Sequence, residues 1–75
     1  MSYYETHTGT VAFYKDDGDR PFGFIKPDEN LADCYLSPRG FKSPRETFQK
    51  GDRVRFRIEE ARGGRSPLAV DVELL

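Results

Sequence analysis

Arg20-Pro21-Phe22-Gly23-Phe24-Ile25 is the stretch that decides how this chain folds. Alternate residues of a β-strand point to the same face of its sheet. We therefore expect Phe22 and Phe24 side by side on one face, with Gly23 and Ile25 on the other. Glycine in a strand lets another backbone or a ligand approach closely. The stretch thus predicts a strand with a pair of aromatic rings on one side and an anchor for a core on the other.

Two interpretations of this aromatic pair are open. Cations lie at both ends of the strand, Arg20 and Lys26, and flat rings beside cations suit stacked nucleobases on a charged backbone. Alternatively, both phenylalanines are buried in a core, since hydrophobic strands are common. The spacing of the residues does not distinguish a base-stacking pair from a buried one. The rest of the chain is needed to decide between these two interpretations.

The composition indicates one small domain. The chain has 75 residues, of which 36% are apolar and 33% charged, which allows one modest core and is too polar for a membrane span. No stretch has the pattern of a signal peptide. Cys34 is the only cysteine, which rules out an internal disulfide, fits a reducing cytosol and predicts a cytoplasmic protein. We expect Cys34 to be a small core residue and His7, the only histidine, to lie at the surface.

Charge is distributed unevenly along the chain. The net charge is −1, but residues 1–38 carry three basic and seven acidic side chains, and residues 39–75 carry nine basic and six acidic ones. A nearly neutral protein can therefore still present a basic stripe. The small net charge predicts a modest affinity for nucleic acid that depends strongly on salt.

Five short segments have the β-branched and aromatic composition of strands. Turns rich in glycine, proline and aspartate separate them, and no segment has the periodicity of an amphipathic helix. The predicted strands are Gly9–Lys15, Phe22–Lys26, Asp33–Ser37, Arg53–Glu59 and Leu68–Leu74. Five antiparallel strands in so small a chain favour a closed or nearly closed β-barrel, because closure removes the sheet edges. We expect an all-β domain over residues 9–75, preceded by a loose leader over residues 1–8.

Alternation assigns the faces of the first and third strands. Phe13 and Tyr14 are adjacent, so they should point to opposite faces, and at least one should face solvent or the aromatic pair. Cys34 and Leu36 share a face that suits the core. Tyr35 would then join the two phenylalanines if the second and third strands are neighbours.

The last two strands alternate clearly. In the fourth strand the expected inward residues are Val54, Phe56 and Ile58, and the outward ones are Arg53, Arg55 and Arg57. The arginines either form a solvated face or a charge-protected edge, which we favour, or contact phosphates. In the fifth strand we expect Leu68, Val70, Val72 and Leu74 to point inward and Ala69, Asp71 and Glu73 to point outward. Asp71 and Glu73 could then pair with the arginines across the strands.

Two connecting segments carry further candidates. The acidic run 16–19 is predicted to be a turn, because the spacing of a calcium-binding loop and its flanking helices are absent. The connection 39–50 is long, which is typical of functional loops. Within it Phe41, beside Arg39 and Lys42, is a candidate exposed aromatic, whereas Phe48 is expected to plug the core.

The chain from about Gly9 to Leu75 resembles the cold-shock domain, a five-stranded OB-type barrel that binds single-stranded nucleic acid. The resemblance depends on the order and spacing of several short motifs rather than on any one of them. They are the opening Gly9, Val11, Phe13 and Tyr14, the first ribonucleoprotein motif ending in Phe22 to Ile25, Asp33, Gly40 to Lys42, Gly51, and Gly64, Pro67, Ala69 and Val72.

The resemblance implies a binding face. Phe13 stands where the family usually has tryptophan, Phe22 and Phe24 match its two stacking phenylalanines, and Tyr35 matches the first aromatic of its second ribonucleoprotein motif. Phe41 corresponds to the stacking aromatic of the long loop. Lys15, Arg20, Lys26 and Lys42 are the cations expected to attract phosphates.

The chain also departs from the family pattern. Ser37 stands where the family has histidine and Pro38 where it has a second phenylalanine, so two stacking groups are missing. Arg20-Pro21 replaces lysine-glycine before the first phenylalanine. At roughly 1–3 kcal/mol for each stacked base, the loss of two groups would weaken binding considerably.

Two functions therefore remain open. The first is a module that binds single-stranded RNA or DNA with little sequence preference and acts as an RNA chaperone. The alternative is a protein-interaction or structural barrel with weakened or lost nucleic-acid binding, favoured by Ser37, Pro38 and the acidic first half. We expect no enzyme, no catalytic residue, no metal, no cofactor, no small-molecule substrate and no membrane partner, because the sequence lacks a nucleophile–base pair, a metal-ligand cluster and a phosphate-binding glycine loop.

Overall fold

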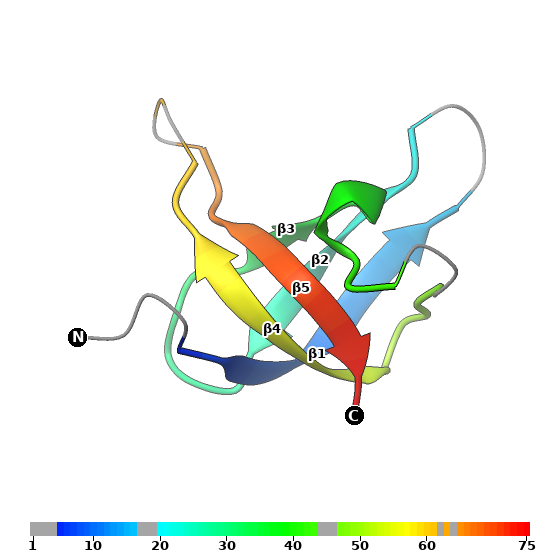
Figure 1. The fold of residues 1–75 in the computed structure, drawn as a ribbon, viewed down its shortest axis with the longest axis horizontal. Coiled ribbons are helices and arrows are strands. Elements are labelled where there is room, and N and C mark those ends of the chain that lie inside the picture. The colour runs from blue at the N-terminus through cyan, green and yellow to red at the C-terminus, as the bar shows by residue number, and fades with distance from the viewer. Residues whose placement is uncertain (1–4, 17–19, 44–46, 62, 64) are drawn as a thin grey trace.

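The computed structural model describes residues 5–16, 20–43, 47–61, 63 and 65–75 (Figure 1). The described chain forms five strands and one 3₁₀ turn: β1 (His7–Lys15), β2 (Phe22–Pro27), β3 (Cys34–Leu36), η1 (Pro38–Gly40), β4 (Arg53–Glu59) and β5 (Leu68–Leu74). The strands close into a barrel in the order β1-β2-β3-β5-β4. All neighbouring strands are antiparallel except β3 and β5, which run parallel. The predicted all-β, five-stranded barrel is confirmed, and the β3–β5 pair is where it departs from the expected antiparallel arrangement.

β1 starts earlier than its composition indicated. It begins at His7, where Gly9 was expected, so the expected leader over residues 1–8 overlaps this strand by two residues. His7 lies opposite Phe56 of β4. The expectation of a surface histidine is wrong: the side chain of His7 is only 14% exposed, and its Nδ1 lies 2.7 Å from a carboxylate oxygen of Glu29. Pairing with β4 accounts for this, because it places the imidazole against the Phe56 ring, with 6.2 Å between the ring centroids.

A β-bulge at Ala12 determines which aromatic residue of β1 faces outward. Val11 lies opposite Ile25, but Phe13 lies opposite Phe24, so β1 has one more residue here than β2. A bulge of this kind shifts the following side chains to the other face. Val11 is therefore buried, whereas Phe13, which strict alternation would have put on the same face, lies outside. The prediction that Phe13 and its neighbour Tyr14 point to opposite faces is confirmed, since Tyr14 packs against the core.

Gly23 allows β1 and β2 to approach closely. A Cβ atom at this position would lie 2.1 Å from the carbonyl oxygen of Phe13 and 2.9 Å from the Cα atom of Tyr14. Both of those are backbone atoms, which a small rotation of a side chain cannot move away. Gly23 is thus the residue that lets the two aromatic strands pair at this point.

The core fills the inside of the barrel. It consists of Val11, Ile25, Cys34, Leu36, Phe48, Val54, Phe56, Ala69 and Val72. The expectations that Cys34 is a core residue and that Phe48 plugs the core are confirmed. Burial, together with the nearby carboxylate of Asp33, raises the pKa of the Cys34 thiol to about 11.

A second bulge changes the faces of β5. Arg55 lies opposite Glu73 and Arg57 opposite Val70, so two residues of β5 face the single Phe56 between them. Asp71 accommodates the extra residue of the bulge by adopting a φ of 52°. This is a left-handed conformation, which aspartate tolerates better than most residues.

The bulge makes the predicted alternation of β5 wrong. Ala69, expected outside, is only 2% exposed, because a strand with an extra residue buries side chains three apart, here Ala69 and Val72, instead of two apart. Val72 is buried as predicted, and Leu68 and Val70 are half-buried. Leu74 lies opposite buried Val54, on the predicted face, but it is 47% exposed because it is the last residue of the strand.

Candidate nucleic-acid interface

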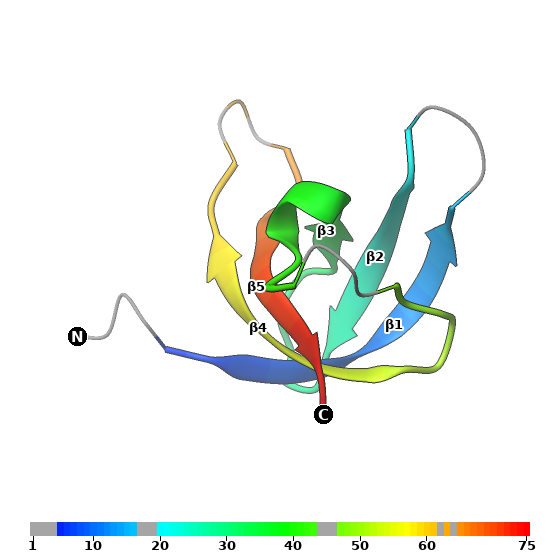
Figure 2. The ribbon, with the colours of Figure 1, turned by 45° about the vertical axis from the view of Figure 1, so that its right-hand side comes forward.

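Four aromatic side chains gather on the outer face of β1, β2 and β3, and we call them the aromatic platform: Phe13, Phe22, Phe24 and Tyr35. The ring of Phe13 lies 5.7 Å from the rings of both Phe22 and Phe24, measured between centroids. Tyr35 lies 6.3 Å from Phe22 and 5.7 Å from Phe24. Every ring therefore contacts at least two others, although the residues come from three strands that lie side by side (Figure 2).

Strand register builds this platform. Phe13, Phe24 and Tyr35 lie directly opposite one another across β1, β2 and β3. Phe22 precedes Phe24 by two residues and so shares its face. Sequence reasoning predicted that Tyr35 would join the two phenylalanines if their strands were neighbours, and this prediction is confirmed.

The rings of the platform are accessible from outside. Phe13 is 37% exposed, and the other three side chains are half-buried, so the interpretation that places Phe22 and Phe24 in the core is wrong. The planes of Phe22 and Tyr35 are within 15° of parallel. Phe13 meets Phe22 edge-on at 87°, and Phe24 meets Tyr35 at 78°. Edge-to-face contacts of this kind are favourable and hold the rings in place.

Three cations surround the platform. Lys15 lies opposite Phe22, and Lys26 follows Phe24 by two residues on the same face of β2. Arg20 precedes the strand. All three side chains are exposed, and none of them has an ion-pair partner among the residues that the structure describes. Their charges are therefore available to an anionic ligand.

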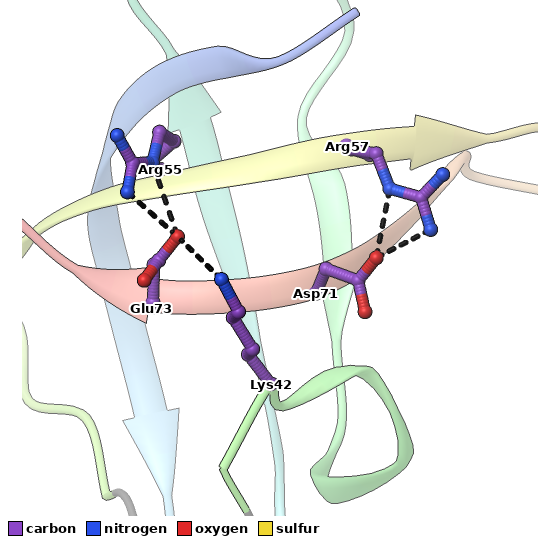
Figure 3. A network of polar contacts seen from close by, with 5 residues as sticks. All are labelled: Lys42, Arg55, Arg57, Asp71 and Glu73. Carbon is purple, nitrogen blue, oxygen red and sulfur yellow. Dashed lines mark hydrogen bonds and ion pairs between the residues drawn. The ribbon is translucent and has the colours of Figure 1, made fainter. Parts of the chain in front are cut away.

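The opposite situation holds on the outer face of β4 and β5, which we call the ion-paired face: Lys42, Arg55, Arg57, Asp71 and Glu73 (Figure 3). Arg55 donates from Nε and Nη2 to Glu73 Oε2, at 3.1 and 2.9 Å, and Lys42 Nζ lies 3.4 Å from the same oxygen. Arg57 donates from Nε to Asp71 Oδ2 at 2.8 Å. The hydrogen bonds from Arg55, with the charges of Arg55 and Lys42, lower the pKa of Glu73. The predicted pairing of Asp71 and Glu73 with arginines is confirmed.

The third arginine of β4 is also neutralised. Arg53 binds both carboxylate oxygens of Asp28 at 2.7 and 2.6 Å. Thr8 donates to the same carboxylate at 2.7 Å. These hydrogen bonds, that from Arg53 foremost, hold the pKa of Asp28 well below its usual range. Because β4 pairs with strands on both sides, it is not an edge strand, and its arginines form a paired, solvated row.

Phe41 and Lys42 lie away from the platform. Phe41 is half-buried, with its ring 4.8 Å from Phe48 and 5.8 Å from Tyr14, so the expectation of an exposed aromatic is wrong. The connection after η1 runs along β5, where the Lys42 N–H donates to the Val72 carbonyl at 3.0 Å. This contact turns the ring inward and puts the Lys42 side chain on the ion-paired face. Six of the nine predicted binding residues thus share the outer face of β1, β2 and β3, Arg20 precedes β2, and these two lie elsewhere.

Sequence reasoning missed a hollow beside Tyr35. A pocket of about 1160 Å³ lies between β3 and the connection from β4 to β5, with Tyr35, Leu68, Glu59, Glu60 and Arg65 among its lining residues. Leu68 had been assigned to the inside of the barrel. The signal that could have found the pocket is the pairing of β3 with β5, which no local pattern reports.

Neither a metal centre nor a membrane helix is found in the described part of the chain. No three His, Cys, Asp or Glu side chains there lie close enough together to hold a metal ion. No helix among these residues is long and apolar enough to cross a membrane. The acidic run 16–19, which is predicted to be a turn, lies outside the described residues except for Asp16.

The family model for the "'Cold-shock' DNA-binding domain" matches residues 7–75. The chain belongs to the cold-shock DNA-binding domain family. The match begins at the first residue of β1 and spans the whole barrel, so the fold is the OB-type barrel of cold-shock domains and the chain is a nucleic-acid-binding domain. The family is non-catalytic. A search of curated proteins finds no match to the chain.

This cold-shock domain departs from the family pattern where β3 ends. Ser37 is half-buried, and Pro38 starts η1 directly after it. Proline cannot donate a backbone hydrogen bond and is typical of the first position of a helical turn. The second ribonucleoprotein motif therefore supplies one ring to the platform, Tyr35.

Proposed function

We propose that this cold-shock domain binds single-stranded RNA or DNA by stacking bases on the aromatic platform. The observation that carries the proposal is the exposed cluster of four rings surrounded by cations without ion-pair partners in the described structure. Stacking on aromatic side chains contributes about 1–3 kcal/mol per base and accepts every base. A duplex hides its base faces, so the platform would select the single strand.

The distribution of free charge supports this surface over the arginine row of β4. Lys15, Arg20 and Lys26 belong to the acidic first half of the sequence, yet they are the cations left available around the platform. The three arginines of β4 in the basic second half are matched by Asp28, Asp71 and Glu73. Phosphates following the platform would therefore meet cations, whereas those following β4 would meet arginines that already hold carboxylates.

An RNA-chaperone activity follows from such binding without any chemical step. A protein that binds only the single strand shifts the equilibrium away from base-paired RNA by mass action. Because its affinity would be modest, the domain would release the RNA strand again, and the released RNA could then refold. This would suit a domain with one small platform and few phosphate contacts.

The alternative function is a protein-interaction or structural barrel. Ser37 and Pro38, in place of two stacking groups, favour it, as does the net charge of −1. Against it stands the accessibility of Phe22 and Phe24, which are half-buried on the outer face and are not part of the core. We therefore favour the single-strand binder.

The test is fluorescence anisotropy of a labelled oligothymidine of about seven nucleotides, a length within one OB-fold site, at low and moderate salt. We expect saturable binding that weakens with salt. Replacing both phenylalanines with alanine (Phe22→Ala/Phe24→Ala) should lower the affinity by roughly two powers of ten, since two stacking rings are lost.

The matched control is Phe22→Leu/Phe24→Leu, which keeps apolar side chains but removes the aromatic faces. It should bind nearly as poorly as the alanine variant while its circular dichroism spectrum stays that of the wild type. A folded wild-type protein that does not bind at low salt would refute the proposal, and a protein partner for the same face should then be sought.

A further inference from the structure

The aromatic row does not end at Tyr35. The register of the barrel continues it, because Tyr35 lies opposite Leu68 of β5, and Leu68 lies opposite Glu59 of β4. Residues directly opposite each other share a face of the sheet. The outer face therefore carries one continuous row across all five strands: Phe13, Phe24, Tyr35, Leu68 and Glu59.

This row leads from the platform into the pocket beside Tyr35. Neighbouring strands are about 4.8 Å apart, so Glu59 lies roughly 10 Å beyond Tyr35 across the sheet. Leu68, half-buried, provides an apolar surface between them. The pocket and the platform share the Tyr35 side chain, so a strand lying across the rings can place its next base in the pocket.

Carboxylates line the far side of this pocket. Glu59 and Glu60 are exposed, and neither has a hydrogen-bond or ion-pair partner in the described part of the chain. An ionised carboxylate only accepts hydrogen bonds. Arg65, which also lines the pocket, is the cation available for the phosphate that such a base would bring.

We propose that the pocket holds the base that follows the one stacked on Tyr35, and that Glu59 and Glu60 favour a base with an exocyclic amino group. The proposal rests on the single-strand binding proposed above. Cytosine presents an amino donor at N4, where thymine presents the O4 acceptor. A carboxylate accepts from the first and repels the second, while Leu68 contacts the face of either base.

The test compares labelled oligodeoxycytidine and oligodeoxythymidine of the same length, about seven nucleotides. The two differ at the position that the carboxylates would read. Wild-type protein should bind oligocytidine about fivefold more tightly, the low end of base discrimination by a side-chain hydrogen bond. In Glu59→Gln/Glu60→Gln the preference should fall to within about twofold, because an amide both donates and accepts.

Glu73→Gln is the matched control. It changes the net charge in the same direction but lies on the ion-paired face, so it should keep the preference for cytidine. Equal binding of the two oligonucleotides by wild type, or an unchanged preference in the double variant, would overturn this inference and leave single-strand binding intact. Absence of binding to both oligonucleotides would overturn single-strand binding and this inference together.

Discussion

At the scale of the residue, Phe41 illustrates how a side chain of the right type can be in the wrong place for its expected role. It lies in a long connection beside cations, which is typical of a binding loop. In the folded chain its ring contacts Phe48 and Tyr14, and its backbone bridges to Val72. Its burial therefore contributes to stability. The platform rings, in contrast, lie on the outer face of β1, β2 and β3.

Replacing Phe41 with alanine should accordingly lower stability and leave binding unchanged. Truncation of a half-buried phenylalanine is expected to reduce the free energy of unfolding by about 2 kcal/mol, less than for a fully buried one. Urea denaturation measures this loss, and anisotropy under conditions where the variant is folded measures the affinity for oligothymidine. A loss of affinity as large as that caused by Phe22→Ala would contradict this prediction and show that Phe41 belongs to the binding face.

At the scale of the element, β2 and β4 use their cations differently. Lys26 of β2 projects beside the platform and has no ion-pair partner in the described structure. Each outward arginine of β4 holds a carboxylate from β5 or from the residue after β2. Surface ion pairs contribute little to stability one by one, but they remove charge that would otherwise attract phosphates.

This difference predicts which strand determines the salt dependence of binding. Each phosphate contact to a single strand contributes about −0.7 to the slope of log K against log salt, so three contacting cations give a slope of about −2. Lys15→Ala/Lys26→Ala should reduce the slope by about 1.4. The control Arg55→Ala, which removes one cation from the ion-paired face, should leave the slope nearly unchanged. If Arg55→Ala reduced the slope more than Lys15→Ala/Lys26→Ala does, the phosphates would contact β4 instead.

At the scale of the whole molecule, Asp28 joins three parts of the barrel. It follows β2, accepts from Thr8 of β1 and binds Arg53 of β4 through both oxygens. Its own N–H donates to the Thr8 carbonyl at 2.9 Å. The carboxylate thus helps to close the barrel at the end where β1 pairs with both of its neighbours.

The stability of the barrel should therefore depend on pH in the acidic range, through the ionisation of the Asp28 carboxylate. Because folding lowers its pKa, the carboxylate contributes stability that is present above the unfolded value of about 3.9 and is lost as the pH falls towards the lower folded value. At neutral pH the Asp28→Asn variant should unfold at a lower urea concentration than the wild type. This difference in urea concentration should shrink as the pH falls. Asp33→Asn, an exposed carboxylate with no hydrogen bond to another described side chain, is the control and should change neither quantity.

The local pattern of the chain was sufficient for several features. Period-two alternation and turn residues located five strands, and the spacing of Phe22 and Phe24 placed two rings on one face. Tyr35 followed from the same alternation once its strand was assumed to be a neighbour. These features depend on residues within a few positions of one another, which is why they can be read without a structure.

Tertiary structure decided what depends on how distant strands register. The bulges at Ala12 and Asp71, which put Phe13 outside and Ala69 inside, compensate for mismatched lengths of paired strands. The matching of the β4 arginines with distant carboxylates, and the row from Tyr35 to Glu59, arise only when the barrel closes. A linear sequence states which side chains alternate, but their partners across the sheet are set by packing and hydrogen bonding between segments far apart in the chain.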